Sequence, residues 1–160
     1  MGLIDAILQL FRRPAALQVG MLCTRQGPEG PEVLLVKTLD TGRWIIPKGW
    51  PMKGRSLQDA AAREAWEEAG ARGRVLPQEI GRLAGTKRLK SGLEVPSEIA
   101  VFQMQDTQLS DIYPEARKRK RRMLPARQAA DLADMPDLAD LIRRMFPCPR
   151  FRVAVAEQTL

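Results

Sequence analysis

The stretch from residue 47 to residue 71, PKGWPMKGRSLQDAAAREAWEEAGA, is the most informative part of this chain. Its second half places Glu64, Glu67 and Glu68 at positions i, i+3 and i+4, which lie on one face of an α-helix. Carboxylates at this spacing repel each other and destabilise the helix. A hard divalent cation with several oxygen ligands offsets that repulsion. The spacing therefore predicts a Mg²⁺ site, with Mn²⁺ as a substitute ion, and the alternative is a solvated helix face without a ligand.

The residues that flank the three glutamates predict a loop, then a helix, and then the end of that helix. Ser56 precedes Asp59 by three residues, which is the spacing of an N-terminal capping box. Gly70 can adopt the left-handed conformation that ends many helices. Several alanines between them are suited to close packing on a sheet. The acidic cluster is therefore expected on a short helix that covers a sheet.

The same stretch resembles the Nudix box, whose pattern is G-x5-E-x7-R-E-U-x-E-E-x-G-U with U an apolar residue. The matching positions are Gly49, Arg63, Glu64, Ala65, Glu67, Glu68, Gly70 and Ala71. The resemblance implies an α/β protein, a Nudix-type α/β/α sandwich with a mixed β-sheet. It also implies a metal-dependent pyrophosphohydrolase. The order of strands and helices expected along the chain favours the same layered architecture.

The resemblance to the Nudix family also implies a role for each residue of the motif. Glu67 and Glu68 would bind the metal ion, and the backbone carbonyl of Gly49 would add a ligand. Glu64 is either a third metal ligand or the base that takes the proton from the attacking water. Arg63 would hold a glutamate in position, so we expect Glu64 and Arg63 to be catalytic. The metal ion would neutralise the phosphoanhydride and activate the water.

One position departs from the family pattern, because Arg55 stands where the family has its first glutamate. Three outcomes are open. The site could bind fewer metal ions and keep its chemistry. Arg55 could clamp the substrate, because a guanidinium group binds phosphate oxygens in pairs. Finally, the change could abolish catalysis and leave a domain that only binds nucleotide or RNA.

Basic side chains outnumber acidic ones and give the chain a net charge of +7, which favours anionic partners. Six consecutive bases occupy residues 117–122. If residues 117–124 form a strand, alternate side chains of this run would face the cleft. The alternative is a solvated edge strand whose charges prevent aggregation. The side chains expected to bind substrate are Arg43, Lys48, Arg55, Lys87, Arg117 and Arg119.

Residues 112–123, together with Pro47-Lys48-Gly49-Trp50, look like the corresponding parts of the diphosphoinositol polyphosphate phosphohydrolases. Met123 stands near the position of a tryptophan in that branch. The similarity implies cleavage of phosphoanhydride bonds in diadenosine polyphosphates, inositol pyrophosphates or polyphosphate. A 5′-end RNA pyrophosphohydrolase is the alternative enzyme, with RNA as its partner. Trp44 and Trp50 are candidates for stacking on a base, whereas Trp66 is expected in the core.

The chain is expected to form one domain at residues 15–146, with a helix at 1–14 and a tail at 147–160. The amphipathic helix would pack on the domain or on a second subunit of a homodimer, and an anionic membrane surface is the alternative. With no histidine in the chain, histidine-based catalysis and histidine-ligated metals are excluded. Cys23 and Cys148 match no zinc or redox motif. No transmembrane segment or signal peptide is recognisable, so a cytoplasmic protein is expected.

Strands are expected at residues 17–25, 32–38, 43–46, 73–76, 79–88 and 97–104. A break at Met135-Pro136 precedes a helical stripe that is expected to lie in the core, formed by Leu138, Leu141, Ile142 and Met145.

Overall fold

The computed structural model describes residue 4 and residues 15–149. The helix predicted at residues 1–14 lies outside the described residues apart from Ile4, and so does most of the predicted tail at 147–160. The role of the predicted N-terminal helix in a dimer or at a membrane therefore stays a prediction. None of the helices in the described part of the chain combines the length and the hydrophobicity that a membrane span requires.

A mixed sheet of seven strands forms the centre of the described part of the chain. Its main path runs in the order β3-β2-β1-β6-β5, while β4 pairs with β1 and β7 pairs with β2. Strands β1 and β6 are parallel, and the other pairs are antiparallel. The strands are β1 (Ala16–Gly27), β2 (Gly30–Lys37), β3 (Trp44–Ile45), β4 (Lys48–Gly49), β5 (Ala71–Arg88), β6 (Glu94–Leu109) and β7 (Arg121–Pro125).

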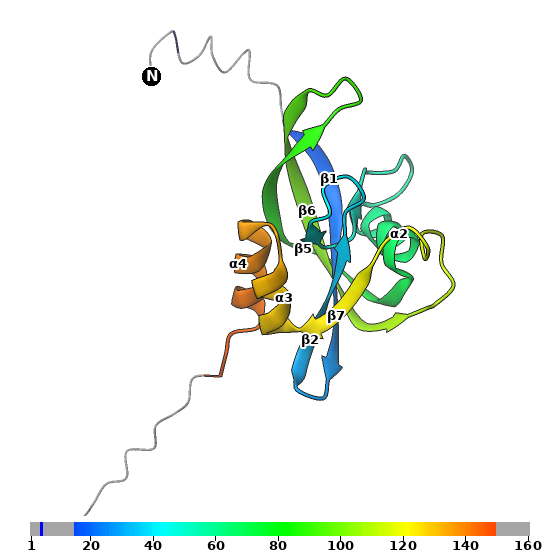
Figure 1. Cartoon of the computed structure of the whole chain (residues 1–160), viewed down its shortest axis with the longest axis vertical. Coiled ribbons are helices and arrows are strands. Elements are labelled where there is room, and N and C mark those ends of the chain that lie inside the picture. The colour runs from blue at the N-terminus through cyan, green and yellow to red at the C-terminus, as the bar shows by residue number, and fades with distance from the viewer. Residues whose placement is uncertain (1–3, 5–14, 150–160) are drawn as a thin grey trace, which may run out of the picture.

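Helices cover both faces of this sheet (Figure 1). Helix α2 (Leu57–Ala69) lies on one face, and helices α3 (Ala126–Leu132) and α4 (Pro136–Met145) lie on the other. Because side chains alternate along a strand, neighbouring residues of the central strands enter different cores. Val33 and Leu35 pack on the side of α3 and α4, whereas Leu34 and Val36 pack on the side of α2. The predicted α/β/α sandwich with a mixed sheet is confirmed.

Helix α2 begins and ends where its sequence predicts. The hydroxyl of Ser56 accepts a hydrogen bond from the backbone N–H of Asp59 at 3.2 Å. Gly70 has φ 63° and donates its N–H to carbonyls of the last helical turn. The face toward the sheet is lined by fully buried alanines, which let the helix approach closely: Ala60, Ala61, Ala65 and Ala69.

Some strand predictions were wrong in extent. Residues 73–76 and 79–88 belong to one strand, β5, whose register against β6 shifts between Val75 and Gly81. Residues 117–120 are not part of a strand, because Lys118 and Arg119 both donate their N–H groups to the carbonyl of Glu115 in a turn. Strand β7 begins only at Arg121. The alternation expected over 117–124 therefore does not occur.

The environment of Trp66 differs from the one expected from the sequence. Trp66 is only half-buried and stacks under the guanidinium group of Arg72 at 4.0 Å, rather than lying in the core.

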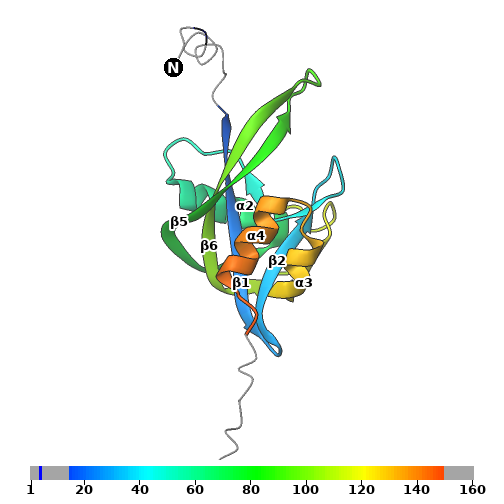
Figure 2. The ribbon, with the colours of Figure 1, turned by 90° about the vertical axis from the view of Figure 1, so that its left-hand side faces the viewer.

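The ends of β5 and β6 form a hairpin that projects beyond the rest of the sheet (Figure 2). The predicted stripe on α4 does enter the core, where Leu138, Leu141 and Ile142 are buried. Cys23 and Cys148 are free, and burial raises the pKa of the Cys23 thiol.

Candidate active site

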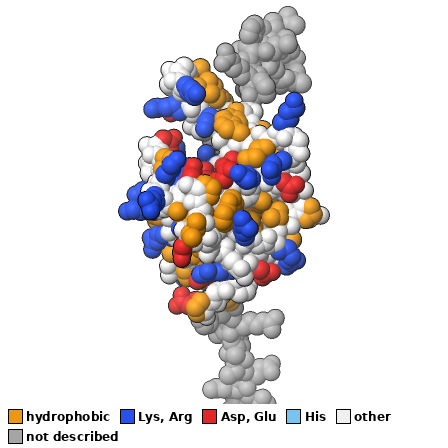
Figure 3. Space-filling model, turned by 90° about the vertical axis from the view of Figure 1, so that its right-hand side faces the viewer, with side chains coloured by type: hydrophobic (Ala, Val, Ile, Leu, Met, Phe, Trp, Pro, Cys, Tyr) orange, Lys and Arg blue, Asp and Glu red, His pale blue; other side chains and the backbone are white. Residues whose placement is uncertain are grey.

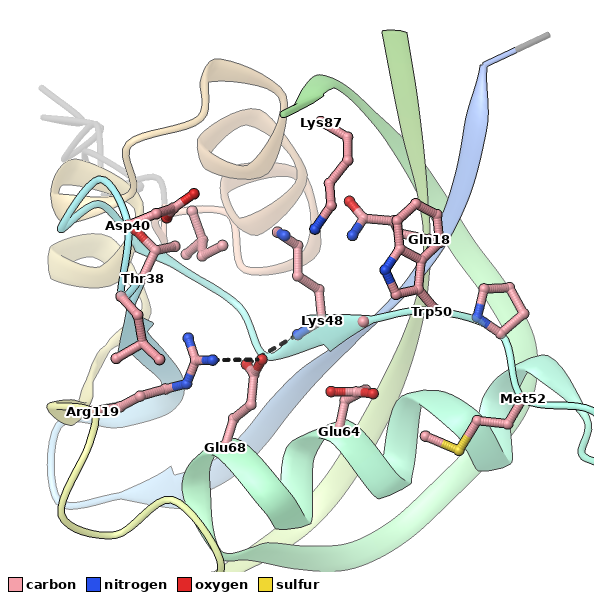
Figure 4. A pocket seen from close by; sticks show the side chains of 14 residues that line it. Gln18, Thr38, Asp40, Lys48, Trp50, Met52, Glu64, Glu68, Lys87 and Arg119 are labelled. Atoms are coloured by element: carbon pink, nitrogen blue, oxygen red, sulfur yellow. Dashed lines mark hydrogen bonds and ion pairs between the residues drawn. The ribbon is translucent and has the colours of Figure 1, made fainter. Parts of the chain in front are cut away.

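A cavity of about 410 Å³ opens between α2, strand β4 and the loop that follows β2. Acidic side chains gather in a hollow on this side of the molecule, with Lys and Arg side chains around them (Figure 3). Figure 4 shows the cavity from close by. Its lining consists of Gln18, Thr38, Leu39, Asp40, Ile45, Lys48, Gly49, Trp50, Pro51, Met52, Glu64, Glu68, Lys87 and Arg119.

Two of the three clustered glutamates line this cavity. Glu64 and Glu68 point from α2 toward strand β4 (Figure 4). One carboxylate oxygen of Glu68 accepts a hydrogen bond from the backbone N–H of Lys48 at 3.3 Å. Glu67 is not among the lining residues, and its carboxylate accepts a hydrogen bond from Nε of Arg63 at 2.6 Å. The structure therefore separates the acidic cluster into a pair facing the cavity and a third glutamate held beside it.

The two cavity glutamates occupy an environment that disfavours their charged forms. Burial raises the pKa of Glu64 to about 7, and the charges of Glu67 and Glu115 add to the shift. Burial also raises the pKa of Glu68 to about 7, although the nearby Arg119 opposes the shift. Carboxylic groups with such pKa values in a cavity are typical of functional sites.

This donor set fits a magnesium ion that is completed by the substrate. Within residues 15–149, no three acidic or cysteine side chains converge as a ready-made metal cage. Magnesium, however, is commonly held by one or two carboxylates together with waters and substrate phosphates. Glu64 and Glu68 supply two such carboxylates, and a cation beside them would stabilise the charged forms that burial disfavours.

Arg119 is the counter-charge that the structure places beside Glu68. Its guanidinium group lies 3.2 Å from Oε1 of Glu68 and 2.5 Å from Oε2 of Glu115. The Arg119 side chain is 13% exposed and that of Glu68 is 9% exposed, so this ion pair is nearly buried. The loop before β7 thus delivers one base of the run 117–122 into the cavity.

The other side chains predicted to bind substrate fall into two groups. Lys48 and Lys87 line the cavity, and Arg43 lines a smaller cavity that adjoins it. Arg55 is exposed in the turn before α2 and is not among the lining residues. Arg117 is exposed and borders a separate surface hollow beside Tyr113. The structure therefore brings together Lys48, Lys87 and Arg119, with Arg43 nearby, and leaves Arg55 and Arg117 outside.

Several residues of the cavity were not singled out as site residues from the sequence. Gln18, Thr38 and Asp40 line it from β1 and from the loop after β2, and no local motif marks them. Glu115 holds Arg119 in place, and only its position before the basic run could have drawn attention to it. Among the tryptophans, Trp50 borders the cavity, whereas Trp44 packs against the core beneath α3 and α4.

Gly49 provides a direct test of the position of Glu64. A Cβ atom at residue 49 would overlap the Glu64 carboxylate, and only the absence of a side chain allows this approach. Gly49→Ala is expected to displace that flexible carboxylate and to lower kcat/KM by about 10- to 100-fold, because a 1 Å misplacement of a reacting group costs that much. Thermal unfolding should stay close to that of the wild type. Unchanged activity would show that the position of Glu64 does not matter for the reaction.

Comparison with known proteins places this geometry in a family. The model of the NUDIX domain family matches residues 15–145. A *C. elegans* Ap4A hydrolase is similar in structure, with 21% identity, a TM-score of 0.56, and coverage of 82% of this chain and 96% of that chain. The *E. coli* dihydroneopterin triphosphate pyrophosphohydrolase gives 16% identity, a TM-score of 0.59, and coverage of 84% and 95%.

The Nudix domain of *Shewanella oneidensis* NrtR, solved with ADP ribose, is also similar in structure. It has 15% identity and a TM-score of 0.58, and the match covers 91% of this chain and 99% of that chain. At these identities the solved structures show the shared fold. The match to the family model supports the prediction of a Nudix-type pyrophosphohydrolase. With its motif helix, cavity and family match in agreement, the chain belongs to the Nudix family.

Proposed function

We propose that this protein is a Mg²⁺-dependent hydrolase that cleaves phosphoanhydride bonds in a polyphosphorylated substrate. One observation carries the proposal: Glu64 and Glu68 share a cavity with Lys48, Lys87 and Arg119. Carboxylates suit a divalent cation, and bases suit the phosphates that complete its coordination. When bound, the ion would neutralise the anhydride and activate the attacking water.

The side chains of the cavity have different roles in the proposed reaction. Lys48 and Lys87 bind the phosphate oxygens, and Arg119 offers them Nη1, because its Nε and Nη2 pair with Glu115 and Glu68. Glu68 holds the cation. Glu64, whose pKa lies near neutrality, serves either as a further ligand or as the base for the water. Trp50, which is 45% exposed at the rim, offers its ring for stacking.

The substrate class that we propose is a diadenosine polyphosphate or an inositol pyrophosphate. Three bases in the cavity and two more in the adjoining cavity favour a chain of phosphates over a single diphosphate. The fold shared with the *C. elegans* Ap4A hydrolase agrees with this class.

Specific observations support two alternative functions. The side chains of Arg117, Lys118, Lys120 and Arg122 are exposed, which leaves 5′-triphosphorylated RNA as an alternative substrate. Arg63 pairs with Glu67, and Arg55 lies outside the cavity, which suits a domain that binds nucleotide without cleaving it. The NrtR Nudix domain with ADP ribose is an example of a Nudix domain with a bound ligand.

Product release by the purified protein with Mg²⁺ tests these functions. The substrates are diadenosine polyphosphates, an inositol pyrophosphate, nucleoside triphosphates, ADP-ribose and triphosphorylated RNA, and Mn²⁺ is tested in parallel. Metal-dependent cleavage that disappears in the Glu64→Gln, Glu68→Gln double variant is the expected result. Binding without cleavage of any substrate would overturn the hydrolase in favour of a binding domain.

A further inference from the structure

A smaller cavity of about 100 Å³ adjoins the first and continues away from the two glutamates. The two cavities share Gln18, Thr38, Asp40, Ile45, Lys48 and Lys87. Beyond these, the smaller one is bordered by the bases Arg43 and Arg88 and by the hydroxyl groups of Thr41, Thr86 and Ser97. Asp40 is the one acidic residue in its lining, and no aromatic ring borders it.

Two lysines face each other where the cavities meet. The side chain of Lys48 points away from Glu68 and toward that of Lys87, which descends from the β5–β6 hairpin (Figure 4). The two ammonium groups carry like charges and repel each other. Neither lysine forms an ion pair among the residues of the described chain. An anion between the two ammonium groups would offset their repulsion.

Arg43 is oriented by its own loop toward the smaller cavity. Its Nε donates a hydrogen bond to the hydroxyl of Thr41 at 3.1 Å, and its backbone N–H donates to the hydroxyl of Thr38 at 2.9 Å. Those two hydroxyl groups are in turn 2.8 Å apart. Asp40 is engaged as well, because its carboxylate accepts the N–H of Thr41 at 2.8 Å. The terminal nitrogens of Arg43 therefore remain available for a ligand.

The size of the smaller cavity limits what it can hold. Its volume of about 100 Å³ is about a quarter of the 410 Å³ of the first cavity. That space suits a phosphate group and is small for a nucleoside. Its lining of bases and hydroxyl groups offers donors to phosphate oxygens, and it offers no aromatic surface for stacking.

We propose that the smaller cavity is a distal phosphate subsite, formed by Arg43, Lys48 and Lys87. It would bind a phosphate group that lies beyond the cleaved anhydride, while Glu64 and Glu68 act on the anhydride itself. The proposal rests on the proposed hydrolase and narrows its substrate class. The preferred substrate carries at least one further phosphate group, as an inositol pyrophosphate does, and not a nucleoside at that end.

Calorimetric binding of inorganic tripolyphosphate in the presence of EDTA tests the subsite without any hydrolysis. Arg43→Gln is expected to raise the Kd at least about tenfold, because hydrogen bonds to charged groups are strong. Arg127→Gln on α3 is the control, because it removes the same charge at an exposed position outside both cavities. Its Kd should change less than about twofold. No detectable binding by the wild-type chain, or equal weakening by both variants, would overturn the subsite.

Steady-state kinetics with Mg²⁺ provide the second readout. Arg43→Gln should lower kcat/KM for an inositol pyrophosphate by a larger factor than for ADP-ribose, which has no phosphate beyond its diphosphate. Equal losses on both substrates would contradict the subsite. The EDTA experiment keeps the two proposals separate: tripolyphosphate binding that depends on Arg43 but comes with no turnover rejects the hydrolase, and turnover with binding that ignores Arg43 rejects the subsite.

Discussion

Glu68→Gln is expected to lower kcat/KM by about 10²- to 10³-fold, the range found when a single charge-stabilising group is removed from an active site. The amide has nearly the same shape and can still accept the N–H of Lys48. It loses the negative charge that a cation requires. In the metal-free protein the change removes a buried carboxylate whose pKa is raised to about 7, so the melting temperature is not expected to fall.

Asp59→Asn is the matched control for this variant. Asp59 lies on the same helix, is exposed, and is not part of the cavity lining, so its activity should match that of the wild type. The variant Glu67→Gln measures how much the third glutamate contributes to activity. A smaller loss than for Glu68→Gln is expected, because Glu67 pairs with Arg63 beside the cavity. Full activity of Glu68→Gln would show that Glu68 takes no part in the reaction.

Gly70→Ala is expected to cost about 2–4 kcal/mol of stability and to lower the melting temperature by about 5–15 °C. Gly70 has φ 63°, which strains any L side chain. An added Cβ would also lie 2.6 Å from Cδ1 of Tyr113 and 2.7 Å from the backbone carbonyl oxygen of Ser110. The backbone oxygen cannot move aside as a side chain can, so strain and overlap add together. Chemical denaturation measures the loss.

Gly54→Ala separates the two causes. Gly54 has φ 75°, but nothing lies within 4 Å of an added Cβ. It should therefore lose only the strain contribution, about 1 kcal/mol. Equal losses at the two positions would show that the contact of Gly70 with residues 110–113 adds nothing to stability.

The helix and the fold class could be predicted from the sequence because their signals are local. Ser56, Asp59 and Gly70 mark the ends of α2 by their chemistry, and the motif spacing requires no knowledge of distant residues. The extent of the strands could not be predicted in the same way. Strand β5 continues through Pro77 because β6 pairs with it on both sides of an irregular register, which is a property of the partner strand.

The separate position of Glu67 has a physical basis in helix geometry. At about 100° per residue, Glu68 lies about 40° to one side of Glu64, and Glu67 lies about 60° to the other. Arg63 lies a further 40° beyond Glu67, so these two residues meet at the edge of the acidic face. Counting all three glutamates as one face concealed this difference.

The basic run could not be interpreted without its tertiary partners. Arg119 pairs with Glu68 and Glu115, and Arg121 donates to the backbone carbonyls of Ala69 and Ser110. A run of like charges in a sequence gives no indication that two of its members are bound within the protein. Its net charge therefore overstates what the run offers to a ligand.

The contacts between the end of α2 and residues 110–121 have a consequence for amide hydrogen exchange. The N–H of Glu115 donates to the carbonyl of Glu67, the N–H of Ser110 donates to that of Gly70, and Arg121 joins Ala69 to Ser110. The last turn of the helix cannot open while these bonds remain. The end of α2 and residues 110–121 are thus expected to form one cooperative unit whose amides exchange together. Any ligand held by Glu68 and Arg119 slows exchange in both segments, although they are far apart in the sequence.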